Sequence, residues 1–180
     1  MTVIVQKPEF NLREKLSELE FGTLPYEKMP AGSVIQVAFN SLYGSAIGTT
    51  SSSFQDSGLF VNISPRFLSS KIIVSASVDA QTGNAAGRGV EYTFFRNIGA
   101  DATATSPSVN LLQDSAQGNY ISYASPNGYI HERAAMLTED NPNTTERVQY
   151  RVFFHSHGGA SSGFNKDWGG ITIKAEEIRQ

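Results

Sequence analysis

The 180-residue sequence contains no cysteine. This absence excludes disulfides, thiolate metal sites and a cysteine nucleophile, and it removes the main sign of a small secreted scaffold. Charge is also sparse, since 14 Lys and Arg residues stand against 17 Asp and Glu residues, for a formal net charge of −3. There is no basic stripe of the kind that follows a phosphate backbone, so we expect no nucleic-acid partner.

Long apolar runs and a targeting signal are lacking as well. No run approaches the ~20 apolar residues that a membrane-spanning helix needs, so we expect no membrane partner. The start, MTVIVQKPEF, has a short apolar run with no basic region before it, which is typical of neither a secretory signal nor a transit peptide. A chain of this length accommodates one β-sandwich or barrel plus an extension.

The N-terminal part carries a short helical pattern. Asn11 is a good N-cap, and Gly22 is a natural helix stop. Between them Leu12, Leu16 and Leu19 follow at spacings of four and three, which places them on one helical face. A helix of about three turns is too short to be stable alone in water. Its leucine stripe must therefore pack on its own β-domain, on sister chains or on a larger assembly, and we favour an intermolecular contact.

An extended arm follows this helix. In the stretch TLPYEKMPAGS, Pro25 and Pro30 fix φ and push the residues before them toward extended conformations, so the arm is semi-rigid. We predict an N-terminal anchor in residues 1–32 and a β-domain in residues 33–180. The predicted assembly and anchor residues are Leu12, Leu16, Leu19, Phe21, Leu24 and Tyr26.

Beyond residue 33 the hydrophobic period changes to two, which is the pattern of half-buried strands. The segments with this pattern are 35–39, 59–64, 72–79, 90–95, 120–124, 129–137, 148–154 and 171–175. Turn-forming sequences such as ISPRF, SPNG, DNPN and GGASSG separate them. We predict an all-β fold, an antiparallel β-sandwich or jelly roll of about eight strands, preceded by the short helix and arm.

The most metal-like feature is the pair His155 and His157. Alternate residues of a strand point to the same face, so both imidazoles could share one side, with His131 or Asp167 as a third ligand. The alternative is that these rings are polar residues at a strand end before a glycine loop. We favour this alternative and predict no metal site and no cofactor.

Catalytic patterns are weak. There is no G-x-S-x-G elbow on a strand-to-helix turn. Glu132, Glu139 and Asp140 could be proposed as glycosidase carboxylates, but their sequence spacing supports no pair. The glycine-rich stretches 87–89 and 158–163 precede strands, so they indicate hairpin loops and no phosphate cradle. The protein is predicted not to be an enzyme.

Four aromatic residues lie near loop-like segments. Exposed aromatics can stack on sugar rings or form an interface hot spot, whereas buried ones would pack in the core or at its rim. The predicted loop contacts are Tyr120, Tyr123, Tyr129 and Trp168.

Four stretches together resemble a known group of proteins. They are LPYEKMPAGSVIQV at 24–37, TSSSFQDSGLFVNISP at 50–65 followed by SSKIIV at 69–74, YTFFRN at 92–97, and NTTERVQYRV at 143–152. As an ordered set they resemble small virion surface proteins of tailed bacteriophages, especially those of aquatic bacteria and cyanobacteria. The resemblance covers most of the chain from about residue 24 onward.

This resemblance implies a jelly-roll-like domain, commonly trimeric, on the virion surface, as in tail fibres and capsid decoration proteins. The sequence lacks a long shaft and a separate tail-binding domain, which is closer to a decoration (cement) protein. We therefore expect a homotrimer, assembled in the host bacterial cytoplasm, that docks on the major capsid protein through its N-terminal segment. The alternative is a tail-fibre or receptor-binding protein that attaches to a tail component and contacts a host surface glycan or protein. No catalytic residues carry over.

Overall fold

The computed structural model describes residues 25–44, 46–82, 88–99, 109–112, 120–123, 131–164 and 170–180, with the backbone alone for residues 120–123. These residues form one 3-10 turn and eleven strands. The elements are η1 (Tyr26–Lys28), β1 (Val34–Leu42), β2 (Ile47–Thr49), β3 (Gln55–Ile63), β4 (Lys71–Gln81), β5 (Gly89–Ile98), β6 (Val109–Asn110), β7 (Tyr120–Tyr123), β8 (His131–Asp140), β9 (Val148–His157), β10 (Ser162–Phe164) and β11 (Ile171–Ile178).

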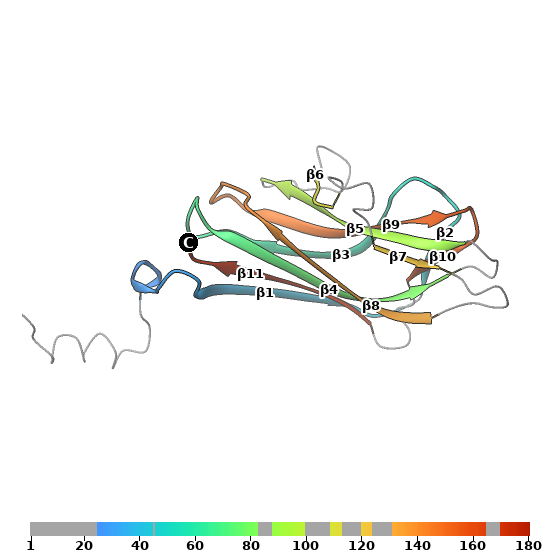
Figure 1. The fold of residues 1–180 in the computed structure, drawn as a ribbon, viewed down its shortest axis with the longest axis horizontal. Helices are drawn as coiled ribbons and strands as arrows, with labels where there is room; N and C mark the ends of the chain where they lie inside the picture. Colours follow the sequence, from blue (N-terminus) through green and yellow to red (C-terminus); the bar gives the residue numbers. More distant parts are fainter. Residues whose placement is uncertain are drawn as a thin grey trace, which may run out of the picture.

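The strands form two antiparallel sheets that face each other (Figure 1). In the first sheet, β4 pairs with β11 on one side and with β8 on the other, and β1 pairs with the far side of β11. The short strands β10 and β2 extend this sheet beside the last residues of β4. In the second sheet the order is β3-β9-β5, and both β6 and β7 pair with the outer side of β5.

The strand order is that of a jelly roll. Without β2, β6 and β10, one sheet reads β1-β11-β4-β8, and the other reads β3-β9-β5-β7. Most connections between them cross from one sheet to the other, so neighbours within a sheet are far apart in sequence. The predicted fold class, an antiparallel sandwich or jelly roll, is confirmed.

The core lies between the two sheets, and burial alternates strictly along β4 and β11, whereas β5 and β9 also bury some residues of their other face. In β4 every second residue is buried, from Ile72 to Ala80. In β5 and β9 the residues Val90, Phe94, Val148 and Val152 are fully buried and face this layer. Burial of each such side chain contributes roughly 1.5–3 kcal/mol. These strands have the period that the sequence predicted.

Strand β1 departs from the predicted pattern. The sequence places Ile35, Val37 and Phe39 on one face, but only Ile35 is buried, while Val37 and Phe39 are 56% and 63% exposed. The pairing of β1 with β11 shifts register between Val34 and Gln36. Such a bulge adds one residue, which turns every later side chain to the other face of the sheet.

The glycine-rich stretch 158–163 also differs from its prediction as a loop. Its last residues begin β10, which pairs with both β2 and β4. Gly163 is required there, because a Cβ atom would lie 1.9 Å from the carbonyl oxygen of Ile47. Any side chain at this position would therefore push the backbones of β10 and β2 apart.

The two ends of the sandwich differ. The arm turn η1 and the C-terminal end of β11 lie at one end, whereas β2, β7 and β10 lie toward the other (Figure 1). The arm is tied to β11, since Gly32 N donates to Arg179 O at 2.7 Å and Arg179 N donates to Ser33 O at 3.0 Å. The predicted helix around Leu12–Leu19 lies outside the described residues.

None of the helices in the described part of the chain has the length and hydrophobicity that crossing a membrane requires.

Candidate functional site

The end of the sandwich that carries the arm is built around a buried carboxylate. Glu177 of β11 is fully buried and accepts hydrogen bonds from Arg66 N at 2.6 Å and Ser70 Oγ at 2.5 Å. The side-chain amide of Gln36, oriented with its nitrogen toward Glu177, donates to Glu177 Oε2 and to Ser64 O, both at 3.0 Å. One side chain of β11 thus fixes the loop between β3 and β4 and also a residue of β1.

Two arginines are stacked on aromatic rings at this end. The guanidinium of Arg66 lies 4.8 Å from the centroid of the Tyr26 ring, and that of Arg179 lies 5.8 Å from the centroid of Phe67. Within the described residues, neither guanidinium forms an ion pair. Stacking covers the face of a guanidinium and leaves its N–H edge available for hydrogen bonding.

Apolar side chains accompany these arginines. Leu68 is 64% exposed, Val34 is 46% exposed and Tyr26 is 41% exposed. Arginine and exposed aromatic residues are enriched at protein interfaces, and lysine and glutamate are depleted. We call this region the arm-end surface; it consists of Tyr26, Val34, Arg66, Phe67, Leu68 and Arg179.

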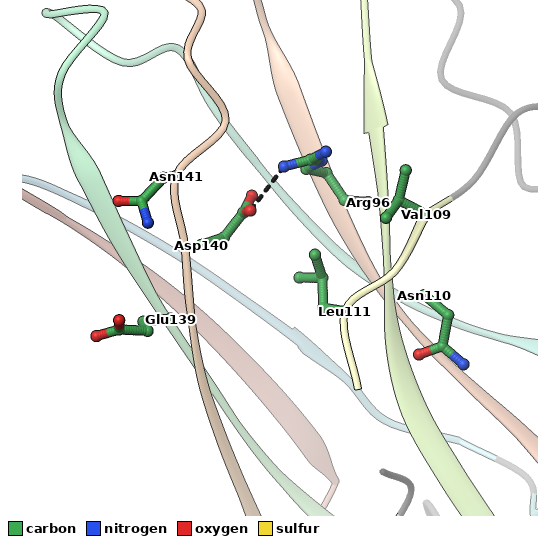
Figure 2. Close-up of a pocket in the computed structure, with 7 residues that line it drawn as sticks. All are labelled: Arg96, Val109, Asn110, Leu111, Glu139, Asp140 and Asn141. Atoms are coloured by element: carbon green, nitrogen blue, oxygen red, sulfur yellow. Dashed lines mark hydrogen bonds and ion pairs between the residues drawn. The ribbon is translucent and has the colours of Figure 1, made fainter. Parts of the chain in front are cut away.

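A cleft opens on the side of the sandwich where the first sheet ends at β8 (Figure 2). It is a shallow, open depression of about 760 Å³, lined by Arg96, Val109, Asn110, Leu111, Glu139, Asp140 and Asn141. In Figure 2 Asp140 and Arg96 point toward each other across the cleft, whereas Asn110 and Glu139 point away from it. Its polar groups therefore meet chiefly at one ion pair.

That ion pair is part of a buried network between the sheets. Asp140 of β8 accepts from Arg96 Nη1 of β5 at 2.6 Å and from Tyr150 Oη of β9 at 2.8 Å. Burial raises the pKa of Tyr150 far above its ordinary value, and the charge of Asp140 and its hydrogen bond raise it further, while Arg96 opposes them. The phenol therefore keeps its proton and donates a hydrogen bond to Asp140. Both carboxylate oxygens have protein partners, so this hydrogen-bond network links β8 of the first sheet to β5 and β9 of the second.

The two histidines lie on the outer face of the second sheet. His155 Nε2 is 3.2 Å from Glu91 Oε2, and His157 Nδ1 is 3.8 Å from the same oxygen. They share a face as the sequence predicted, but His131 belongs to β8 in the other sheet and Asp167 lies outside the described residues. Glu91 was missed because only the register of β5 with β9 places it opposite His155. Within the described ranges no group of three or more His, Asp or Glu residues is arranged to hold a metal ion.

The other predicted site residues are only partly placed. Tyr26 lies in η1 and is exposed. Tyr120 and Tyr123 begin and end β7, opposite Tyr92 and Gly89 of β5. The remaining predicted residues, Leu12, Leu16, Leu19, Phe21, Leu24, Tyr129 and Trp168, lie outside the described residues.

Sequence reasoning did not single out Arg66, Leu68 or Arg179. The one available signal was the pair Phe67-Leu68 inside the turn sequence ISPRFLSS, where polar residues are the norm. Nothing in the linear sequence indicated that this turn meets the C-terminal end of β11.

No family model matches the chain, and no curated protein matches it either. Among solved structures, a chain described as "Structure of infectious bursal disease virus Gx strain" aligns with 79% of this chain at 11% identity and a TM-score of 0.35. The alignment covers 39% of that chain. A similarity with this TM-score carries no argument about fold or function.

Proposed function

We propose that the protein is a non-enzymatic structural component of a virion surface, a homotrimer that decorates the capsid and reinforces the shell. It docks on the major capsid protein through its N-terminal segment. The observation that carries this proposal is the separation of the two ends of the jelly roll. The arm joins one end through Arg179, while β2, β7 and β10 lie toward the other (Figure 1). This geometry suits a domain that is anchored at one end and displayed at the other.

The trimer rests on the resemblance alone, because one stripe of three leucines cannot set an oligomeric state. Three copies would bury leucine surface that one short helix cannot bury alone. At ~25 cal/mol per Å², a few hundred Å² of apolar contact per chain contributes several kcal/mol. Linking three anchors in one particle adds avidity without any new contact.

The second candidate function is a tail-fibre or receptor-binding protein that contacts a host surface glycan or protein. The observation that favours it is the position of β7, which carries Tyr120 and Tyr123 and lies toward the end away from the arm (Figure 1). In this case the anchor would attach to a tail component.

The test is immunogold labelling of intact purified virions with an antibody against residues 33–180. Label over the whole head supports the capsid decoration protein. Label confined to the tail supports the second candidate, and particles without label would contradict both.

A companion experiment asks which end holds the protein on the particle. Replacement of Leu12, Leu16 and Leu19 by serine should release a decoration protein, and replacement of Tyr129 and Trp168 by alanine should leave it attached. A protein that keeps its attachment without the three leucines would contradict the proposed anchor.

A further inference from the structure

We infer that the arm-end surface binds a carboxylate-rich patch of an acidic protein, with Arg66 and Arg179 as its charged contacts. The inference rests on the proposed function for the identity of the partner, which is the capsid surface beneath the anchor. Its chemistry follows from the arm-end surface itself.

The first argument is the state of the two guanidiniums. Arg66 and Arg179 are stacked on Tyr26 and Phe67, and within the described residues neither forms an ion pair. Other arginines differ: Arg96 pairs with Asp140, and Arg151 pairs with Asp56. A planar guanidinium with an available N–H edge matches a carboxylate through two parallel hydrogen bonds.

The second argument is that these groups are held in place before any partner arrives. The buried Glu177 accepts from Arg66 N and from Ser70 Oγ, which fixes the loop that carries Arg66, Phe67 and Leu68. Arg179 exchanges backbone hydrogen bonds with the arm. Side chains that are already ordered lose less conformational entropy on binding than mobile ones do.

The third argument is composition. Leu68, Val34 and Tyr26 are each more than 40% exposed beside the two arginines. A mixture of arginine, aromatic and aliphatic side chains is typical of a protein interface. A nucleic-acid surface would instead need a long basic track, and the chain has a net charge of −3.

The fourth argument is position. The described residues begin at Pro25, next to Tyr26, and the 24 residues before it contain the predicted anchor. Leu19 precedes Tyr26 by seven residues, a stretch that spans at most about 25 Å when fully extended, so a partner that holds the leucine stripe lies within that reach of the arm-end surface. Contact there would orient the domain on its support, which a single arm could not do.

The experiment measures binding of the purified full-length protein to particles assembled without it, by co-sedimentation at several salt concentrations. The test variant is Arg66→Glu with Arg179→Glu. The control variant is Arg88→Glu with Lys174→Glu, which changes the formal net charge from −3 to −7 just as the test variant does. Arg88 is exposed just before β5, and Lys174 pairs with Glu176 within β11, so both lie outside the arm-end surface.

We expect the test variant to bind about tenfold more weakly or worse, and the control to bind like wild type. Wild-type binding should weaken as salt rises, because exposed charge pairs are screened. Thermal unfolding shows whether the charge-reversal variant is folded. If it is not, the milder variant Arg66→Gln with Arg179→Gln replaces it in the binding measurement.

A second assay separates this inference from the proposed function. Wild type should elute from immobilised poly-L-glutamate at higher salt than the glutamine pair does. If wild type fails to bind particles but shows this difference, the proposed function fails and the carboxylate-binding surface stands. Equal elution of wild type and the glutamine pair would overturn the inference, as would equal particle binding by test and control variants. Competition by DNA or anionic vesicles, but not by poly-L-glutamate, would also overturn it.

Discussion

Replacement of Asp140 by alanine should be among the most destabilising single changes in the second half of the chain. Asp140 is 8% exposed and supplies the acceptors for both Arg96 and Tyr150. The side chain of Arg96 is only 18% exposed, so its charge would remain largely out of water without a partner. Tyr150 is fully buried, and its hydroxyl would lose its acceptor.

The magnitude follows from these two losses. Removing one partner of a buried ion pair costs about 3–5 kcal/mol, because an uncompensated charge stays behind. A buried hydroxyl without an acceptor costs about 1–3 kcal/mol, which partly overlaps with the first cost. A loss of about 4 kcal/mol would be a large part of the ~5–15 kcal/mol that a domain of this size has in total.

Urea unfolding followed by circular dichroism measures this loss. With a slope of about 1–3 kcal/mol per molar urea, the midpoint should fall by roughly 2 M. Glu139→Ala is the matched control, because Glu139 is the preceding residue, is 59% exposed and pairs with Lys71 at 3.1 Å. That exposed pair should contribute less than about 1 kcal/mol. If the free energies of unfolding of the two variants differ by less than about 1 kcal/mol, the network of Asp140, Arg96 and Tyr150 does not stabilise the contact between the sheets.

Three further changes test other parts of the structure. Burial raises the pKa of Tyr150 above its usual value of 10.0 in the folded protein. Above about pH 10 this tyrosine therefore ionises only in the unfolded chain, and the free energy of unfolding should fall as the pH rises. In urea titrations at alkaline pH, Tyr150→Phe should reduce that fall by up to ~1.4 kcal/mol per pH unit. Gly163→Ala should cost about 1–3 kcal/mol by thermal unfolding, because its Cβ would overlap Ile47 O, and Gly48→Ala, with its nearest contact at 3.3 Å, should cost less. Glu177→Ala should cost about 2–4 kcal/mol and speed amide hydrogen exchange in residues 64–70, since it removes the acceptor of Arg66 N, Ser70 Oγ and Gln36. Unchanged exchange there would mean that the loop is held by other contacts.

The sandwich could be predicted because alternation is a local property of the sequence. Ile72, Val74, Ala76 and Val78 follow each other at every second position, and a strand is the conformation that puts them on one face. The absence of helical periods between such segments then leaves two packed sheets as the way to bury those faces. The pairing order needed the structure, since β4 has neighbours from both β8 and β11.

The register of strand pairing could not be predicted from the sequence at two positions. A single added residue near Ile35 turns Val37 and Phe39 outward, and nothing in the amino-acid types marks that position. Likewise Glu91 meets His155 only because β5 and β9 pair in one particular register. The anchor was predicted from residues before the domain, whereas Arg66 and Arg179 come from a loop and from the residues after β11, which only the fold brings together.

The attachment of the arm has a mechanical consequence for the proposed anchoring. The arm continues directly into β1, and β1 pairs with β11 over eight register partners from Val34–Ile178 to Leu42–Ile171. A pull on the N-terminal segment acts along β1, so it loads these backbone hydrogen bonds together in shear, whereas a pull across the ladder would break them one after another. The hydrogen bonds of Gly32 and Ser33 to Arg179 extend this ladder at the end where the arm enters β1 and share the load. A domain fastened through this arm would therefore resist being pulled open through its β1–β11 ladder, which is what a protein anchored at one end requires.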